Sequence, residues 1–179
     1  MILEDDSKEK VSQLFIQRLP WLLVGLVGGI LASVIVSRFE NVISENISLA
    51  FFLPVIVYIS DAVGTQTESI YIRNLGRGKV NFFTSLFKEM ALGLSLGIIF
   101  GLLIFTFAYF WLNNFQIALT VATAMSVNVA IAPIIALIIP GVLLKEHRDP
   151  ALGAGPFTTV IQDVISLSVY FLIAALILF

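Results

Sequence analysis

The 179-residue chain is 59% hydrophobic and only 12% charged, with a formal net charge of −2 and a mean hydropathy of +1.02. A typical soluble domain carries about twice this charged fraction, so the composition indicates an all-α polytopic membrane protein in a lipid bilayer. The chain has no Cys, which excludes disulfides and thiolate metal sites. We predict neither an enzyme nor a nucleic-acid-binding protein.

Five apolar stretches are long enough to cross a membrane. At about 1.5 Å per residue, roughly 20 helical residues span a hydrocarbon core of about 30 Å. Before them, residues 1–18 are predicted as an N-terminal amphipathic segment on the membrane surface. The evidence is that a short helix would place four residues on one face: Val11, Leu14, Phe15 and Arg18. A frayed tail is the alternative. Residues 19–179 form one membrane domain, with spans predicted at 19–37, 47–72, 89–112, 117–144 and 151–179.

The basic residues predict the orientation of the chain. With five spans, only Arg38 falls on one side of the membrane, and the remaining basic residues fall on the other: Lys8, Lys10, Arg18, Arg73, Arg77, Lys79, Lys88, Lys145 and Arg148. By the positive-inside rule the N-terminus is cytoplasmic and Phe179 is external. We therefore expect a multi-pass protein of the cell (inner) membrane.

Two of the predicted spans carry a polar stripe. The helical repeat places four residues on one face of the second span: Tyr58, Asp61, Thr65 and Glu68. The fifth span carries a similar stripe: Thr159, Gln162, Asp163, Ser166 and Tyr170. Carboxylates at membrane depth are costly and usually mark an ion or substrate path. We expect the two stripes to face one another or a water-filled pathway.

No Lys, Arg or His lies in the middle of a span, so an internal salt bridge is not expected for Asp61 or Asp163. Each carboxyl is then protonated, hydrogen-bonded between helices, or bound to a cation. The stripes offer only oxygen ligands, and such sets suit hard cations. For Glu68, an ion pair with Arg73 at the cytoplasmic surface is an equal alternative.

Several segments resemble the membrane domain of the MgtE-type magnesium channels, which are related to the SLC41 carriers. The resemblance covers residues 17–179 and rests on these motifs: RLPWLL from Arg18, FE from Phe39, FFLPVIV from Phe51, GTQT from Gly64, YIRNLGRGKV from Tyr71 and IIPGVLLKEHRDPALGAGPFTTVIQD from Ile138. The last block is the most specific.

The resemblance implies a homodimer that conducts Mg²⁺ along a pathway near the dimer axis, lined by the second and fifth spans. It implies that Asp163 contacts a largely hydrated Mg²⁺, and that Thr159 and the second-span motif complete the site. The predicted metal-site residues are therefore Asp163, Asp61, Thr159, Thr65, Tyr58 and Glu68.

The chain departs from the family pattern in two respects. The family motif resembles GGNAGTQ, whereas residues 60–66 read SDAVGTQ, so Asp61 replaces a Gly and Ala62 an Asn. The added carboxylate should bind divalent cations more tightly or change their order of preference, with Ca²⁺ and Mn²⁺ as alternatives to Mg²⁺.

The chain also lacks the room for the cytosolic N and CBS domains of such channels. Gating is then absent, intrinsic to the membrane domain or supplied by a separate cytosolic regulatory chain, unless the chain is an excised piece.

Three functions remain open at this point. The first is a dimeric divalent cation channel. The second is an exchanger coupled to Na⁺ or H⁺, with Asp61 or Glu68 as the coupling residue. The third is a non-transporting membrane assembly subunit whose carboxyls are protonated packing groups.

Overall fold

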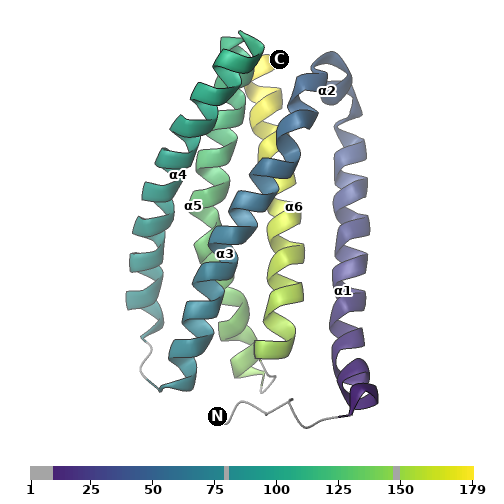
Figure 1. The fold of residues 1–179 in the computed structure, drawn as a ribbon, viewed down its shortest axis with the longest axis vertical. Coiled ribbons are helices and arrows are strands. Elements are labelled where there is room, and N and C mark those ends of the chain that lie inside the picture. The colour runs from purple at the N-terminus through teal and green to yellow at the C-terminus, as the bar shows by residue number, and fades with distance from the viewer. Residues whose placement is uncertain (1–9, 79–80, 147–149) are drawn as a thin grey trace.

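The computed structural model describes residues 10–78, 81–146 and 150–179 of an all-helical chain (Figure 1). Lys8, Lys79, His147 and Arg148 lie outside the described residues. No strand occurs in the described part of the chain. The elements in chain order are α1 (Val11–Arg38), α2 (Glu40–Glu45), the 3-10 helix η2 (Ile47–Phe52), α3 (Leu53–Gly76), α4 (Phe82–Leu112), α5 (Phe115–Lys145) and α6 (Pro150–Leu178).

Five segments are long and apolar enough to cross a membrane, which confirms the predicted number of spans. They are Val11–Arg38, Ile47–Gly76, Phe82–Leu112, Phe115–Lys145 and Ala154–Leu178. Several extend beyond the predicted limits, and α4 begins at Phe82, seven residues before the predicted start of the third span. The start of α1 and the end of α6 lie at opposite ends of the bundle (Figure 1).

The first span is one uninterrupted helix. A break was expected near residue 18, between the amphipathic segment and the first span, but α1 continues from Val11 to Arg38 with Pro20 inside it. A proline removes one backbone hydrogen bond, and the apolar sequence on both sides sustains the helix past it. Residues 1–9 lie outside the described part, so the surface location of residues 1–18 stays a prediction.

The centre of the bundle is α5, which packs against α3, α4 and α6. Three buried glycines of α4, Gly93, Gly97 and Gly101, face α5. A Cβ on Gly97 would lie 2.5 Å from the backbone oxygen of Ser126, so only a glycine permits this approach.

By contrast, α1 lies at one edge of the bundle (Figure 1) and packs mainly on α6. The contact includes an edge-to-face pair between Trp21 and Phe157, with ring centroids 5.7 Å apart. Gly28 of α1 lies directly against Val160 of α6. The position of α6 therefore depends on α1 on one side and on α3 and α5 on the other.

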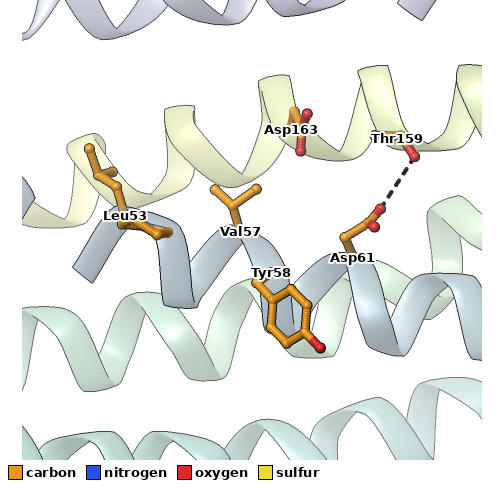
Figure 2. Close-up of a pocket in the computed structure, with 7 residues that line it drawn as sticks. Leu53, Val57, Tyr58, Asp61, Thr159 and Asp163 are labelled. Atoms are coloured by element: carbon orange, nitrogen blue, oxygen red, sulfur yellow. Dashed lines mark hydrogen bonds between the residues drawn. The ribbon is translucent and has the colours of Figure 1, made fainter. Parts of the chain in front are cut away.

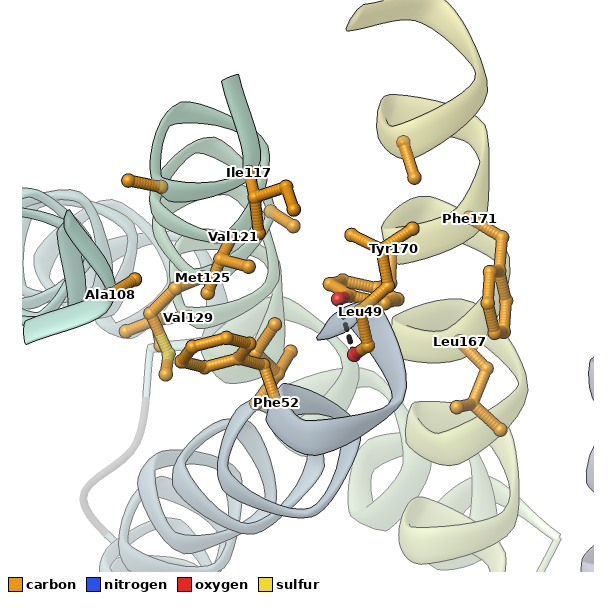
Figure 3. Packing of buried hydrophobic residues seen from close by; sticks show 14 of the residues in the cluster. Leu49, Phe52, Ala108, Ile117, Val121, Met125, Val129, Leu167, Tyr170 and Phe171 are labelled. Atoms are coloured by element: carbon orange, nitrogen blue, oxygen red, sulfur yellow. Dashed lines mark hydrogen bonds between the residues drawn. The ribbon is translucent and has the colours of Figure 1, made fainter. Parts of the chain in front are cut away.

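A hydrogen bond links α6 to η2, the 3-10 helix that leads into α3. The buried Tyr170 hydroxyl donates to the backbone oxygen of Leu49 in η2 over 2.7 Å (Figure 3). In the same region Phe52 packs with Met125 and Val129 of α5 (Figure 3), and all three side chains are at least 98% buried. The bond satisfies a carbonyl of the 3-10 turn and sets the level at which α3 and α6 meet.

Candidate divalent cation site

The two polar stripes lie on neighbouring antiparallel helices, α3 and α6 (Figure 1). Between these helices lies an open groove of about 490 Å³ on the outside of the bundle (Figure 2). We call it the acidic groove, and its lining residues are Leu53, Pro54, Val57, Tyr58, Asp61, Thr159 and Asp163. Four of the six predicted site residues therefore share one groove.

The two carboxylates of the groove come from different helices. The Thr159 hydroxyl donates a long hydrogen bond of 3.4 Å to Asp61 Oδ1, and Asp163 lies one turn further along α6 (Figure 2). Both aspartates are half-buried, whereas Thr159 is exposed. A contact of 3.4 Å is at the outer limit of hydrogen bonding, so Asp61 is only weakly restrained. Its oxygens remain available to a ligand in the groove.

The walls of the groove are apolar at the end where α3 begins, with Leu53, Pro54 and Val57. Sequence reasoning did not select these residues, because apolar residues in a span carry no functional signal. Tyr58 stands at the groove edge with 70% of its surface exposed. An exposed phenol and two half-buried carboxylates in the middle of spanning helices are unfavourable against lipid.

The other two predicted residues lie outside the groove. Thr65 is exposed and does not line it. Glu68 is only 8% exposed, because it points between α3 and α6, where a Cβ on Gly155 would lie 3.9 Å from Glu68 Oε1. The alternative ion pair with Arg73 is not formed in the described part of the chain.

A second polar face, directed into the protein, accompanies Glu68. Ser60 on α3 and Thr158 and Gln162 on α6 are at least 98% buried. The hydroxyls of Ser60 and Thr158 and both amide atoms of Gln162 have no hydrogen-bond partner among the described residues. Sequence reasoning overlooked Ser60 and Thr158 as site candidates. A usable signal was the four-residue spacing of Thr158, Gln162 and Ser166, which matches that of Ser60, Gly64 and Glu68.

A further acidic residue, Glu89 of α4, has a defined partner. Thr67 of α3 is 3% exposed and donates its hydroxyl hydrogen bond to Glu89 Oε2 over 2.8 Å. Glu89 therefore links α3 to α4 and does not contribute to the acidic groove.

The groove of one chain does not enclose a bare metal ion. The described residues include no cluster of three or more His, Cys, Asp or Glu side chains that could hold one. The acidic groove offers two carboxylates, a hydroxyl and a phenol from one side only. Such a surface suits a cation that keeps much of its hydration shell, as Mg²⁺ does.

Five spanning helices with carboxylates at membrane depth define a multi-pass membrane protein of the transport class. The family model described as MgtE, a divalent cation transporter, matches residues 53–173, which include both stripes. The chain belongs to this family, whose members are transporters and not enzymes, and the resemblance predicted from the motifs is confirmed.

Similar proteins include the magnesium transporter MgtE of Bacillus subtilis, 32% identical over 161 residues and 88% of this chain. The magnesium transporter MgtE of Enterococcus faecalis is 31% identical over 89% of the chain. That of Thermus thermophilus is 29% identical over 92%. The chain spans only 36–37% of the length of these relatives. Their similarity is therefore to a part of each protein.

Proposed function

We propose that the chain forms a homodimer that conducts divalent cations, with Mg²⁺ as the main substrate, along a pathway between two acidic grooves. The single observation that carries the proposal is the open groove, which is lined in the middle of spanning helices by an exposed Tyr58 and the half-buried Asp61 and Asp163. Such groups are unfavourable against hydrocarbon, and a second copy of the same groove would cover them.

The electrostatics of the paired grooves favours cations. Two copies bring four carboxylates, Asp61 and Asp163 from each, to one pathway. Clustered carboxylates concentrate cations and repel anions. A membrane potential of 100 mV, negative inside, favours entry of a divalent cation by roughly 4.6 kcal/mol, twice the value for a single charge. No other energy source is then needed for uptake.

In this pathway each polar residue has a role. Asp163 and Asp61 attract the hydrated cation and accept hydrogen bonds from its water ligands. Thr159 donates a long, weak hydrogen bond to Asp61, and Tyr58 contributes a phenol at the groove edge. Thr65 faces outward next to the groove and is proposed to contact water in the dimer. The names of the relatives support Mg²⁺, while Asp61, the carboxylate added to the family motif, keeps Ca²⁺ and Mn²⁺ as further candidates.

The basic residues support a cytoplasmic N-terminus, so the proposed flux is inward from the side on which α6 ends. A separate cytosolic chain would bind on the cytoplasmic side if it regulates the pathway. Residues 1–18, which precede the membrane domain, are proposed to lie at that surface.

Flux measurements test the role of Asp163. In proteoliposomes containing a Mg²⁺ indicator, Asp163→Asn should abolish Mg²⁺ influx, because Asp163 is the proposed main contact to the hydrated cation, whereas Asp61 is an addition to the family motif. The matched control is Glu45→Gln, which changes an exposed carboxylate at the end of α2. Full influx in both variants would contradict the proposal. Influx that requires an opposing Na⁺ or H⁺ gradient would identify an exchanger.

Cysteine cross-linking tests the dimer, because the chain has no Cys of its own. Tyr58→Cys places one thiol at the groove edge of each copy and should give a covalent dimer on oxidation in membranes. Leu102→Cys, on the exposed face of α4, should remain monomeric. The reverse pattern would place the interface on α4 and refute the proposed pathway.

A further inference from the structure

The inner polar face between α3 and α6 contains an ionisable group that the acidic groove does not use. Glu68 is 8% exposed, and no ion pair satisfies it within the described part of the chain. An unpaired buried carboxylate is strongly unfavourable unless it is protonated or bound to a cation. The surroundings of Glu68 therefore decide which of these two states it adopts.

Two polar residues of α6 accompany Glu68 in the interior. Thr158 lies beside it, and Gln162 follows Thr158 by one helical turn. Neither amide atom of Gln162 has a hydrogen-bond partner among the described residues, and the Thr158 hydroxyl lies close to the Glu68 carboxylate without a well-formed hydrogen bond. We call Glu68, Thr158 and Gln162 the inner cluster. A proton on Glu68 would neutralise the carboxylate but would leave the Gln162 amide unpaired, so protonation alone does not account for the cluster.

Gly64 provides the room that the inner cluster occupies. Gly64 is buried one turn before Glu68, and the missing Cβ would overlap the amide oxygen of Gln162. Because α3 and α6 are antiparallel, Gly64 lies level with Gln162 and Glu68 lies level with Thr158 (Figure 1). The three side chains thus meet within about one turn of each helix, or roughly 6 Å along the axes.

We propose that the inner cluster is a second cation site, which binds a small, dehydrated monovalent cation of the Na⁺ class inside each chain. The ligands are the Glu68 carboxylate, the Thr158 hydroxyl and the amide oxygen of Gln162, a set of oxygens that suits a hard cation. One carboxylate balances one positive charge, whereas a divalent ion would leave a net charge in an apolar interior. The inner cluster therefore differs from the acidic groove in both charge and hydration.

The inner cluster lies closer to the end of α3 than to its start. Glu68 lies eight residues before Gly76, the last residue of α3, and this separation corresponds to about 12 Å along the helix. The proposal concerns binding at the inner cluster and does not depend on Mg²⁺ conduction through the acidic groove.

Thermal unfolding of the full chain in detergent tests this site. NaCl is titrated against choline chloride at constant ionic strength, at fixed pH and without Mg²⁺. The midpoint should rise with Na⁺ and then saturate, because a ligand that binds only the folded state stabilises it. Glu68→Gln should weaken the apparent Na⁺ affinity at least about 30-fold, as truncation of one partner of a buried charge pair does. Glu89→Gln, a matched change on α4, should retain the response.

Thr158→Val provides a variant whose folding is not in question. Valine replaces the Thr158 hydroxyl by a methyl group at nearly constant volume and removes at most one weak contact to Glu68, so the protein should stay folded in choline. The same variant should lose most of the Na⁺ response, which a purely structural residue would not do.

Asp163→Asn separates this proposal from the proposed function. The variant should lose Mg²⁺ influx and keep the Na⁺ response, because Asp163 belongs to the acidic groove. Equal midpoints in NaCl and choline, or a response that Glu68→Gln leaves intact, would refute the inner site. Stabilisation by lower pH but not by Na⁺ would also refute it and would identify a proton as the occupant.

Discussion

The contact between α1 and α6 can be tested with two adjacent glycines. A Cβ on Gly28 would lie 2.7 Å from the Cβ of Val160 and closer still to both of its methyl groups, whereas a Cβ on Gly29 would meet nothing within 4 Å. We expect Gly28→Ala to destabilise the protein and Gly29→Ala to leave it unchanged or more stable. The two variants make the same chemical change one residue apart in the same helix.

The magnitude follows from two opposing terms. Replacing Gly by Ala in a helix interior gains about 1 kcal/mol in either variant. Overpacking at Gly28 costs about 1–3 kcal/mol, because Val160 is β-branched and has little rotamer freedom to move aside. The helix term cancels between the variants, so their stabilities should differ by about 1–3 kcal/mol. For a chain of this size, each kcal/mol corresponds to about 2–4 °C in the unfolding midpoint.

The assay is thermal unfolding in one detergent, followed by intrinsic Trp fluorescence. Gly28→Ala should unfold several degrees below Gly29→Ala. The same samples can then be tested for Mg²⁺ influx, because Val160 follows Thr159 of the acidic groove and its displacement should disturb that residue. Equal midpoints, or a lower midpoint for Gly29→Ala, would refute the packing of α1 on α6 described above.

Two further predictions concern the ends and the centre of the α3–α6 pair. Tyr170→Phe removes the buried donor to the Leu49 oxygen and should lower the free energy of unfolding by about 1–3 kcal/mol. Thermal unfolding measures this change. The control is Tyr109→Phe, at a 39% exposed position, which should change the stability little. Asp61→Gly restores the residue of the family motif and should weaken divalent cation binding while preserving influx, so that half-saturation of Mg²⁺ influx shifts to higher concentration. An unchanged half-saturation would show that Asp61 does not contact the hydrated cation.

The number of spans and the two groove carboxylates, Asp61 and Asp163, could be predicted from the sequence. Hydropathy over about 20 residues depends on local composition and on the thickness of the bilayer, so five spans could be counted without a tertiary structure. The cost of a charge at membrane depth likewise marks Asp61 and Asp163 wherever the helices pack. The motif block that ends at Asp163 indicated the family, which the match over residues 53–173 confirmed.

The division of each stripe between two faces was decided by tertiary packing. Successive residues turn by about 100° around a helix, so Gln162 and Asp163 occupy the two edges of one broad stripe. Gln162 is buried against Gly64, whereas Asp163 lines the acidic groove. Which edge points inward depends on the rotation of α6 against its neighbours, and hydropathy does not report that rotation.

Residues on the same side of α6 differ in burial according to their position along the helix. Thr159 and Tyr170 lie within about 20° of each other on a helical projection, yet Thr159 is exposed in the groove and Tyr170 is fully buried. The reason is that η2 covers α6 at the level of Tyr170, where Leu49 accepts its hydrogen bond, and not at the level of Thr159. The sequence by itself therefore determined the spans, the family and the two groove carboxylates. Only the tertiary structure placed Glu68 in the interior, because its environment is formed by α6, about 90 residues away in the chain.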